Sequence, residues 1–398
     1  MQSLKELYRI GNGPSSSHTM GPKKAAAEFL GRNACADSFR VTLYGSLAAT
    51  GRGHLTDVAI LSVLEPVAPV ELVWKPDVFL PFHPNGMLFE SLNEGEVTDS
   101  WTIFSVGGGA LANETTKTAP GESIYGMSSI EEIMRWIDRE GTSFWEYVEK
   151  SEGPGIWDYL REVWAVMRRT IENGLANEGV LPGGLGVRRK AGTYYEKAKA
   201  YNDTLQSRGR IYAYALATAE ENAAGGEIVT APTCGSSGVL PAVLYHLWVS
   251  RNFSEMRILR ALATAGLFGN IVKTNASISG AEVGCQGEIG VACAMAAAAA
   301  CQLFGGTPAQ IEYAAEMALE HHLGLTCDPM CGLVQIPCIE RNAIAAARAF
   351  DSNVYATFSD GKHGVTFDRV VDVMRETGHD IPSLYKETAE GGLARLRK

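Results

Sequence analysis

The pattern of apolar residues changes near residue 128, and this change constrains the fold more than any other feature of the chain. Before that point, short apolar runs such as Ser38–Leu47 and Val70–Trp74 lie between turns rich in Gly and Pro, which predicts strands. Pro22–Leu30 predicts a helix with Pro at its first position. After that point, long amphipathic or Ala-rich segments alternate with Gly-rich breaks, which is typical of packed helices.

A chain of 398 residues is long enough for two domains. We therefore predict an α+β protein, with an N-terminal α/β domain over residues 1–140 and a mostly α-helical domain over residues 141–398. Ser128 and Ser129, followed by Glu131 and Glu132, predict a helix start. Further segments with the helical pattern are Trp157–Glu172, Ile211–Asn222, Val239–Trp248, Glu255–Leu267, Ile289–Phe304, Pro308–His321, Arg341–Phe350 and Val365–Thr377.

Charge and apolar content exclude some classes of partner. The formal net charge of −10 argues against nucleic acid, which would need a basic face. The first residues mix charged and apolar side chains and contain no secretory apolar segment. The longest uncharged apolar run, Ile289–Phe304, is short and rich in Ala, so we expect a buried core helix and no membrane span. The expected location is therefore the cytoplasm, where cysteines are thiols or metal ligands more often than disulfides.

Three cysteines lie in segments marked by Gly or Pro, where the backbone is expected to be irregular: Cys285, Cys327 and Cys338. Three thiolates can hold an iron–sulfur cluster and leave one iron open to a substrate oxygen, which would make that iron a Lewis acid. Their spacing is much wider than in ferredoxins, so spacing alone leaves a metal site as one reading among others. By contrast, Cys293 and Cys301 lie in an Ala-rich helical segment and are expected to be buried small apolar side chains.

A cluster of hydroxyl groups surrounds a histidine near the N-terminus. Ser15, Ser16, Ser17 and Thr19 flank His18 in this segment. Such a group can bind an anion or orient a substrate carboxylate. The alternative is an ordinary helix N-cap, but capping does not need so many hydroxyls beside a histidine. We favour a functional role.

Other candidate features are less specific. His83 and Asn85 lie in a turn that is either part of a site or a plain hairpin turn. Gly107–Gly109 can cradle a phosphate or simply end a strand. Lys273 would form a Schiff base with pyridoxal phosphate if it were desolvated, although a solvated lysine is the more common case.

Several segments, taken together, resemble one family. They are residues 13–19, 44–47, 51–57, 83–87, 221–226, 277–288 and 325–341. The family is that of the iron–sulfur-dependent L-serine dehydratases, also called L-serine ammonia-lyases. The resemblance runs nearly end to end, in the order of the single-chain members, and the cysteine segments are its most specific part.

The resemblance implies a lyase of amino-acid degradation and gluconeogenesis that converts L-serine to pyruvate and ammonia without pyridoxal phosphate. It implies a [4Fe-4S] cluster held by Cys285, Cys327 and Cys338, with one iron open. The N-terminal part resembles the family's β domain, which is related to allosteric substrate-binding domains, and the helical part resembles the α domain. Members are commonly homodimers, so a homodimer is expected here.

With this resemblance, the site is expected between the two domains, where small-molecule sites are often found. The expected catalytic residues are His18, Ser16, Ser17 and His83. The expected substrate-binding residues are Ser15, Thr19, Asn85, Asn275, Ser277 and Ser279. His18, His83 and a serine alkoxide all remain open as the base that removes the α-proton.

The chain departs from the family pattern at a few places. Some single-chain members end in a cysteine that can occupy the open iron, whereas this chain ends in Ala-Arg-Leu-Arg-Lys. Cys331 is either a spare ligand or a core thiol, and we favour the thiol; Cys234 replaces a small or amide residue. The stretch from about 62 to 82 is short compared with some relatives.

Three alternatives remain open at this point. The first is a pyridoxal-phosphate lyase that uses Lys273. The second is an iron–sulfur redox or sensor protein, in which Cys331 closes the cluster. The third is a lyase of the same mechanism that acts on threonine, cysteine or a hydroxy acid.

Overall fold

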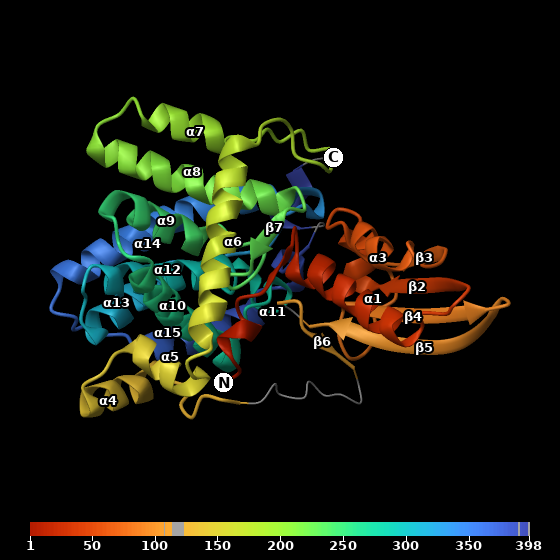
Figure 1. The fold of residues 1–398 in the computed structure, drawn as a ribbon, viewed down its shortest axis with the longest axis horizontal. Coiled ribbons are helices and arrows are strands. Elements are labelled where there is room, and N and C mark those ends of the chain that lie inside the picture. The colour runs from red at the N-terminus through yellow and green to blue at the C-terminus, as the bar shows by residue number, and fades with distance from the viewer. Residues whose placement is uncertain (107, 114–122, 389–390, 397–398) are drawn as a thin grey trace.

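The computed structural model describes residues 1–106, 108–113, 123–388 and 391–396. It consists of a helical body and a smaller α/β region that lie side by side (Figure 1). Each has its own cluster of buried apolar side chains. The α+β class predicted from the sequence is confirmed.

The α/β region is built on a mixed sheet. Its elements are α1 (Gly21–Arg32), β2 (Ser38–Tyr44), α2 (Gly45–Thr50), α3 (Thr56–Leu64), β3 (Val70–Lys75), β4 (Gly86–Asn93), β5 (Glu96–Ser105) and β6 (Leu111–Ala112). The strand order is β3-β2-β4-β5-β6; β2 and β3 are parallel, and the other neighbours are antiparallel. Helices α1 and α3 pack together on the sheet, where Phe29 of α1 contacts Phe39 and Phe89.

The predicted strand over Ser38–Leu47 is wrong at its end, because the chain enters α2 at Gly45. Gly45 has a φ of 49°, in the left-handed region that favours glycine. A Cβ at this position would lie 2.6 Å from the carbonyl oxygen of Pro84. The sharp turn at Gly45 therefore ends the strand and sends the chain toward α3.

The helical body contains most of the remaining elements. They are α4 (Ile130–Glu140), α5 (Phe144–Glu152), α6 (Ile156–Ala176), α7 (Ala191–Ala198), α8 (Asp203–Ala223), β7 (Glu227–Val229), α9 (Val239–Arg251), α10 (Glu255–Asn275), α11 (Gly280–Val283), η3 (Gly284–Gln286), α12 (Ile289–Leu303), α13 (Pro308–Glu320), η4 (Met330–Gly332), α14 (Cys338–Phe358), α15 (Phe367–Asp380), η5 (Ser383–Tyr385) and η6 (Gly392–Leu396). Every predicted helix is present; the main differences are at the ends, as in α14, which starts at Cys338 instead of Arg341.

Helix α12 lies at the centre of the helical body, in contact with α9, α10, α13 and α14. Its many alanines allow neighbouring backbones to approach closely. Cys293 and Cys301 are fully buried in it, which confirms that they are core side chains. Within the described residues, no single helix is long and apolar enough to cross a membrane. The bent pair Gly280–Gln286 and Ile289–Leu303 meets the criteria of length and composition together.

The N-terminal segment starts in the helical body before it enters the α/β region. Leu4, Leu7 and Tyr8 are buried in the helical core, next to η1 (Leu4–Glu6). Strand β1 (Ile10–Asn12) then pairs antiparallel with β7. The hydroxyl-rich segment at residues 13–19 follows directly, so it lies where the two regions meet.

Candidate active site

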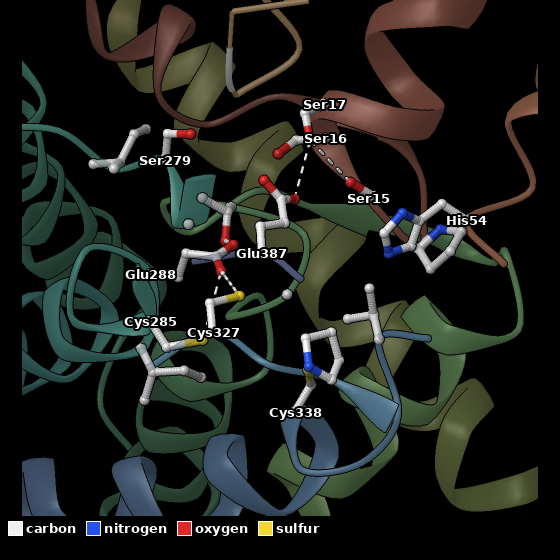
Figure 2. Close-up of a pocket in the computed structure, with 18 of the residues that line it drawn as sticks. Ser15, Ser16, Ser17, His54, Ser279, Cys285, Glu288, Cys327, Cys338 and Glu387 are labelled. Carbon is white, nitrogen blue, oxygen red and sulfur yellow. Dashed lines mark hydrogen bonds between the residues drawn. The ribbon is translucent and has the colours of Figure 1, made fainter. Parts of the chain in front are cut away.

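A cavity lies between the helical body and the α/β region, and both contribute to its lining (Figure 2). The cavity is small, with a volume of about 40 Å³ that is open to water-sized molecules. The helical body supplies the residues that we call the cysteine wall: Cys285, Glu288, Cys327 and Cys338. The other side supplies the serine–histidine wall: Ser15, Ser16, Ser17 and His54.

Short turns between helices position the cysteine wall. Cys285 lies in η3, Cys327 in the loop after α13, and Cys338 at the first position of α14. The Sγ atoms of Cys285 and Cys327 and a carboxylate oxygen of Glu288 all lie within 4.8 Å of one another. Cys338 lines the same cavity outside this tightest group. Cys285, Glu288 and Cys327 can therefore hold a metal.

The thiols of Cys327 and Cys338 lie in an environment that penalises a free thiolate. A hydrogen bond with Cys285, together with burial, raises the pKa of Cys327. Burial likewise raises the pKa of Cys338, and the nearby Arg341 guanidinium only partly offsets this effect. A bound metal would reverse this balance, because it stabilises the thiolate directly.

Two observations fit a metal or cluster at this wall. Thiolates are the donors that iron–sulfur clusters use, so the donor set has the right chemistry. In addition, a Cβ at Gly280 would lie 3.2 Å from Cys327 Sγ and 2.7 Å from Glu288 Oε2. Only glycine leaves this space beside the thiols free.

Glu288 joins the cysteines to the loop after β7. Its Oε1 accepts a hydrogen bond of 2.8 Å from the Thr233 hydroxyl, and its Oε2 lies 3.7 Å from the Sγ atoms of both Cys285 and Cys327. Burial raises the pKa of this carboxyl group. Both carboxylate oxygens of Glu288 therefore have partners within the helical body.

The hydroxyl groups of the opposite wall precede α1, in and next to the π-helical turn η2 (Ser16–Met20). Ser15 caps this turn by accepting a hydrogen bond from the backbone N–H of His18, so the N-cap interpretation holds alongside any binding role. The Ser17 hydroxyl lies 2.8 Å from His18 Nδ1. Among the described lining residues there is no Lys or Arg, so hydroxyl groups are the main side-chain donors there.

His54 is the histidine that lines the cavity. Its ring packs edge-on against His18, with ring centres 4.6 Å apart. Its Nδ1 is buried and has no hydrogen-bond partner among the described residues. Burial lowers the pKa of His54 to about 4, so the imidazole is neutral near pH 7. A neutral ring with a free nitrogen can accept a proton.

Glu387 enters the cavity from the segment after η5, and it lies between Ser17 and Glu288 (Figure 2). Its backbone has a φ of 48°, which is unusual for a residue with a side chain. Its Oε1 accepts a hydrogen bond of 3.5 Å from the Ser17 hydroxyl. Burial and the neighbouring Glu288 carboxylate raise the pKa of Glu387 to about 8.

Known proteins are similar to this chain over almost its whole length. Residues 107–394 match the model of the serine dehydratase alpha chain, and residues 3–72 match that of the serine dehydratase beta chain. The chain belongs to the serine dehydratase family. It is 42% identical to the L-serine dehydratase of Mycobacterium bovis, over 98% of this chain and 97% of that protein. It is 41% identical to that of Streptomyces coelicolor (98% and 98%) and 40% identical to L-serine dehydratase 2 of Escherichia coli (99% and 98%).

In this serine dehydratase chain, the cavity brings together a part of the residues expected from the sequence. Those that line it are Ser15, Ser16, Ser17, Ser279, Cys285, Cys327 and Cys338. His18 lies behind them, and both of its ring nitrogens have partners: Nδ1 contacts Ser17, and Nε2 lies 3.1 Å from the Ser46 hydroxyl. The Thr19 hydroxyl donates to the carbonyl oxygen of His54. His18 and Thr19 thus contact residues of the serine–histidine wall on the side away from the cavity.

The other expected residues do not line the cavity. The ring of His83 accepts a hydrogen bond from the backbone of Asn85, and the Asn85 amide donates to the carbonyl of Ser105. Asn275 donates to the carbonyl of Ser128. Ser277 donates to the exposed Glu282.

Four cavity residues with polar side chains were absent from the expected set: His54, Thr233, Glu288 and Glu387. His54 and Glu288 lie inside the segments that carry the family resemblance, at 51–57 and 277–288, so a signal for them was present. Glu387 lies in a segment with no motif that we recognised.

The remaining sequence candidates have other environments. Cys331 is exposed, so its interpretation as a core thiol is wrong, and it is not among the residues that line the cavity. Cys234 is buried, with its Sγ 3.4 Å from Met20 Sδ. The Lys273 amine donates to the carbonyl of Glu6. Gly107 lies outside the described residues, whereas Gly108 borders the cavity.

Proposed function

We propose that this protein is an L-serine ammonia-lyase, which converts L-serine to pyruvate and ammonia. The observation that carries the proposal is the convergence of the cysteine wall and the serine–histidine wall on one cavity. The relatives named L-serine dehydratase are matched over nearly their whole length, which supports the same reaction.

We propose a [4Fe-4S] cluster as the cofactor, held by Cys285, Cys327 and Cys338. The buried thiols and the space kept open at Gly280 support this choice. When bound, the cluster would supply a Lewis-acidic iron that assists the loss of the substrate hydroxyl group.

The side chains of the opposite wall would do the rest of the chemistry. Hydroxyls of Ser15 and Ser16 donate to the substrate carboxylate, since no Lys or Arg is among the described lining residues. His54 Nδ1 takes the proton from the α-carbon, and the electron pair of that C–H bond forms the C=C bond as hydroxide leaves the β-carbon. The resulting aminoacrylate tautomerises to an imine, and water hydrolyses it to pyruvate and ammonia.

The function is tested by anaerobic reconstitution with iron and sulfide, followed by assays of the 2-oxo acid product: pyruvate from L-serine and D-serine, and 2-oxobutanoate from L-threonine. Pyruvate formation from L-serine is the expected result. A reconstituted protein that binds iron and forms no pyruvate would overturn the proposal. Faster turnover of L-threonine would assign the same mechanism to another substrate.

We also propose a cytoplasmic homodimer. The cytoplasmic location is supported by the buried free thiols of the cysteine wall. The dimer is supported by an exposed apolar surface at the end of α14, where Tyr355 is 60% and Phe358 is 87% exposed, with Leu205 of α8 also exposed. Sedimentation of the wild type and of Phe358→Glu tests this: a dimer that the substitution dissociates is expected, and a wild-type monomer would contradict it.

A further inference from the structure

We propose that Glu387 binds the α-ammonium group of the substrate, and thereby selects amino acids over the corresponding hydroxy acids. This inference rests on the proposed function, since it names the substrate class that the same cavity accepts. It assigns a role to a residue that belongs to neither wall and that comes from the far end of the chain.

The backbone on both sides of Glu387 is fastened to Cys327. The N–H of Cys327 donates to the carbonyl of Tyr385 over 2.8 Å, and the N–H of Thr388 donates to the carbonyl of Cys327 over 3.2 Å. Further along, the N–H of Leu393 donates to Asp328 Oδ2 over 2.9 Å. The backbone of Glu387 is therefore fixed relative to Cys327 of the cysteine wall.

The left-handed backbone of Glu387 is also informative. A non-glycine residue in this conformation is strained, and it persists where the surroundings hold it. Here the two hydrogen bonds to Cys327 hold it, and the side chain points into the cavity beside Ser17 (Figure 2).

The carboxylate of Glu387 lacks a cationic partner within the described residues. No Lys or Arg there forms an ion pair with it, and its nearest basic group is His18 Nδ1, at 3.8 Å. The His18 ring is buried beside His54 and is in contact with Ser17, so it does not supply a resident positive charge. A buried carboxylate without a cation is costly, and a cationic ligand removes that cost.

Of the two acidic side chains that line the cavity within the described residues, Glu387 is the one available to bind an amine. The other acidic side chain, Glu288, already accepts from Thr233 and contacts the thiols. A primary ammonium has three N–H donors, which the Glu387 carboxylate and the Ser17 hydroxyl can accept together. A hydroxy acid of the same length would leave the carboxylate without a partner, which is the condition for strong discrimination.

The test compares L-serine with 3-hydroxypropanoate, which has the same carboxylate and hydroxyl but no amine. Binding of both is measured by anaerobic calorimetry on reconstituted protein that carries His54→Gln to prevent turnover, with Glu387 intact and with Glu387→Gln. We expect the Kd for L-serine to rise about 10- to 100-fold in the variant, as for the loss of a charged hydrogen bond. The Kd for 3-hydroxypropanoate should change by less than about threefold, since it makes no ammonium contact.

Glu94→Gln is a matched control, because Glu94 has a φ of 52° and is exposed in the turn between β4 and β5. It should alter neither Kd. Glu387→Asp keeps the charge and should retain a preference for L-serine, so it tests the inference even if the glutamine variant folds poorly. Iron content and the absorption spectrum should be unchanged in the variants.

An equal loss of affinity for both ligands would overturn the inference, and so would a fall in kcat with an unchanged KM for L-serine. These outcomes are distinct from failure of the proposed function. If the proposed function failed, the wild type would make no pyruvate. A preference for L-serine that depends on Glu387 would still support the ammonium site.

Discussion

The two walls of the cavity differ in how the fold holds them. The cysteine wall is carried by turns at the ends of helices that pack around α12, in the larger apolar core. The serine–histidine wall is carried by residues around α1 and α3, which pack on a smaller and separate core. The cavity therefore depends on the contact between two cores.

This difference separates two kinds of chemistry. The cysteine wall has side chains that can hold a metal, and the serine–histidine wall has hydroxyl groups and a neutral imidazole, which we propose act on the substrate carboxylate and the α-proton. Metal ligands must hold fixed positions, which a closely packed helical core provides. At the cavity, the cysteines come from the helical body, whereas the imidazole of His54 comes from the α/β region.

The largest expected effect comes from removing a cysteine. Cys327→Ala should reduce bound iron to a small fraction and lower turnover of L-serine about 1,000-fold or more, because the Lewis acid would be lost. Iron analysis and the visible absorption spectrum measure the first effect, and the pyruvate assay measures the second.

Cys331→Ser is the matched control for this variant. Cys331 lies four residues further along the same loop, is exposed, and is outside the cavity. The Cys331→Ser variant should retain its bound iron and its turnover of L-serine. Loss of iron in Cys331→Ser would show that this thiol is a ligand and that the cysteine wall extends beyond the three proposed residues.

A substitution in the opposite wall should separate chemistry from metal binding. His54→Gln should leave the iron content unchanged and reduce kcat about 10²- to 10⁴-fold, the usual range for loss of a general base. His83→Gln, outside the cavity, should retain most of its activity. Full turnover by His54→Gln would remove this histidine from the mechanism.

The pH dependence of stability should sharpen the comparison between the two regions. Burial lowers the pKa to about 4 for both His54 of the α/β region and His246 of the helical body. The unfolded chain, with a histidine pKa near 6.5, binds more protons below that pH, so stability is lost as pH falls from about 6.5 toward 4. Each histidine should cost about 2 kcal/mol between pH 7 and pH 5.

Denaturant unfolding at these two pH values measures this loss. His54→Gln and His246→Gln should each reduce the difference between pH 7 and pH 5, whereas the exposed His379→Gln should leave it unchanged. If neither buried-site variant reduced the difference, acid destabilisation would come from other groups.

Much of the fold could be predicted from the sequence. The helical periodicity after residue 128 and the Ala-rich pattern of α12 are local properties, and both appear as predicted. The end of β2 could not be predicted from its apolar run, because the carbonyl of Pro84, from a distant turn, helps to fix the conformation of Gly45.

The candidate site was predictable only in part. The cysteines were recognisable because each lies in a segment with Gly or Pro between helices, within a known family pattern. The position of His54 in the cavity was not predicted, since the sequence singled out His18 and His83 as the candidate histidines. Both ring nitrogens of His18 have hydrogen-bond partners, and this residue does not line the cavity. His54 does line it, and its Nδ1 has no partner among the described residues.

The sequence by itself determined the α+β division, the helices, and the three cysteines as candidate ligands. These follow from side-chain periodicity and residue type, which act over a few neighbouring positions. Only the tertiary structure decided which groups share the cavity. Glu387 and Ser17 come from opposite ends of the chain, and two backbone hydrogen bonds to Cys327 bring the glutamate to this place. No local pattern encodes a contact of that separation.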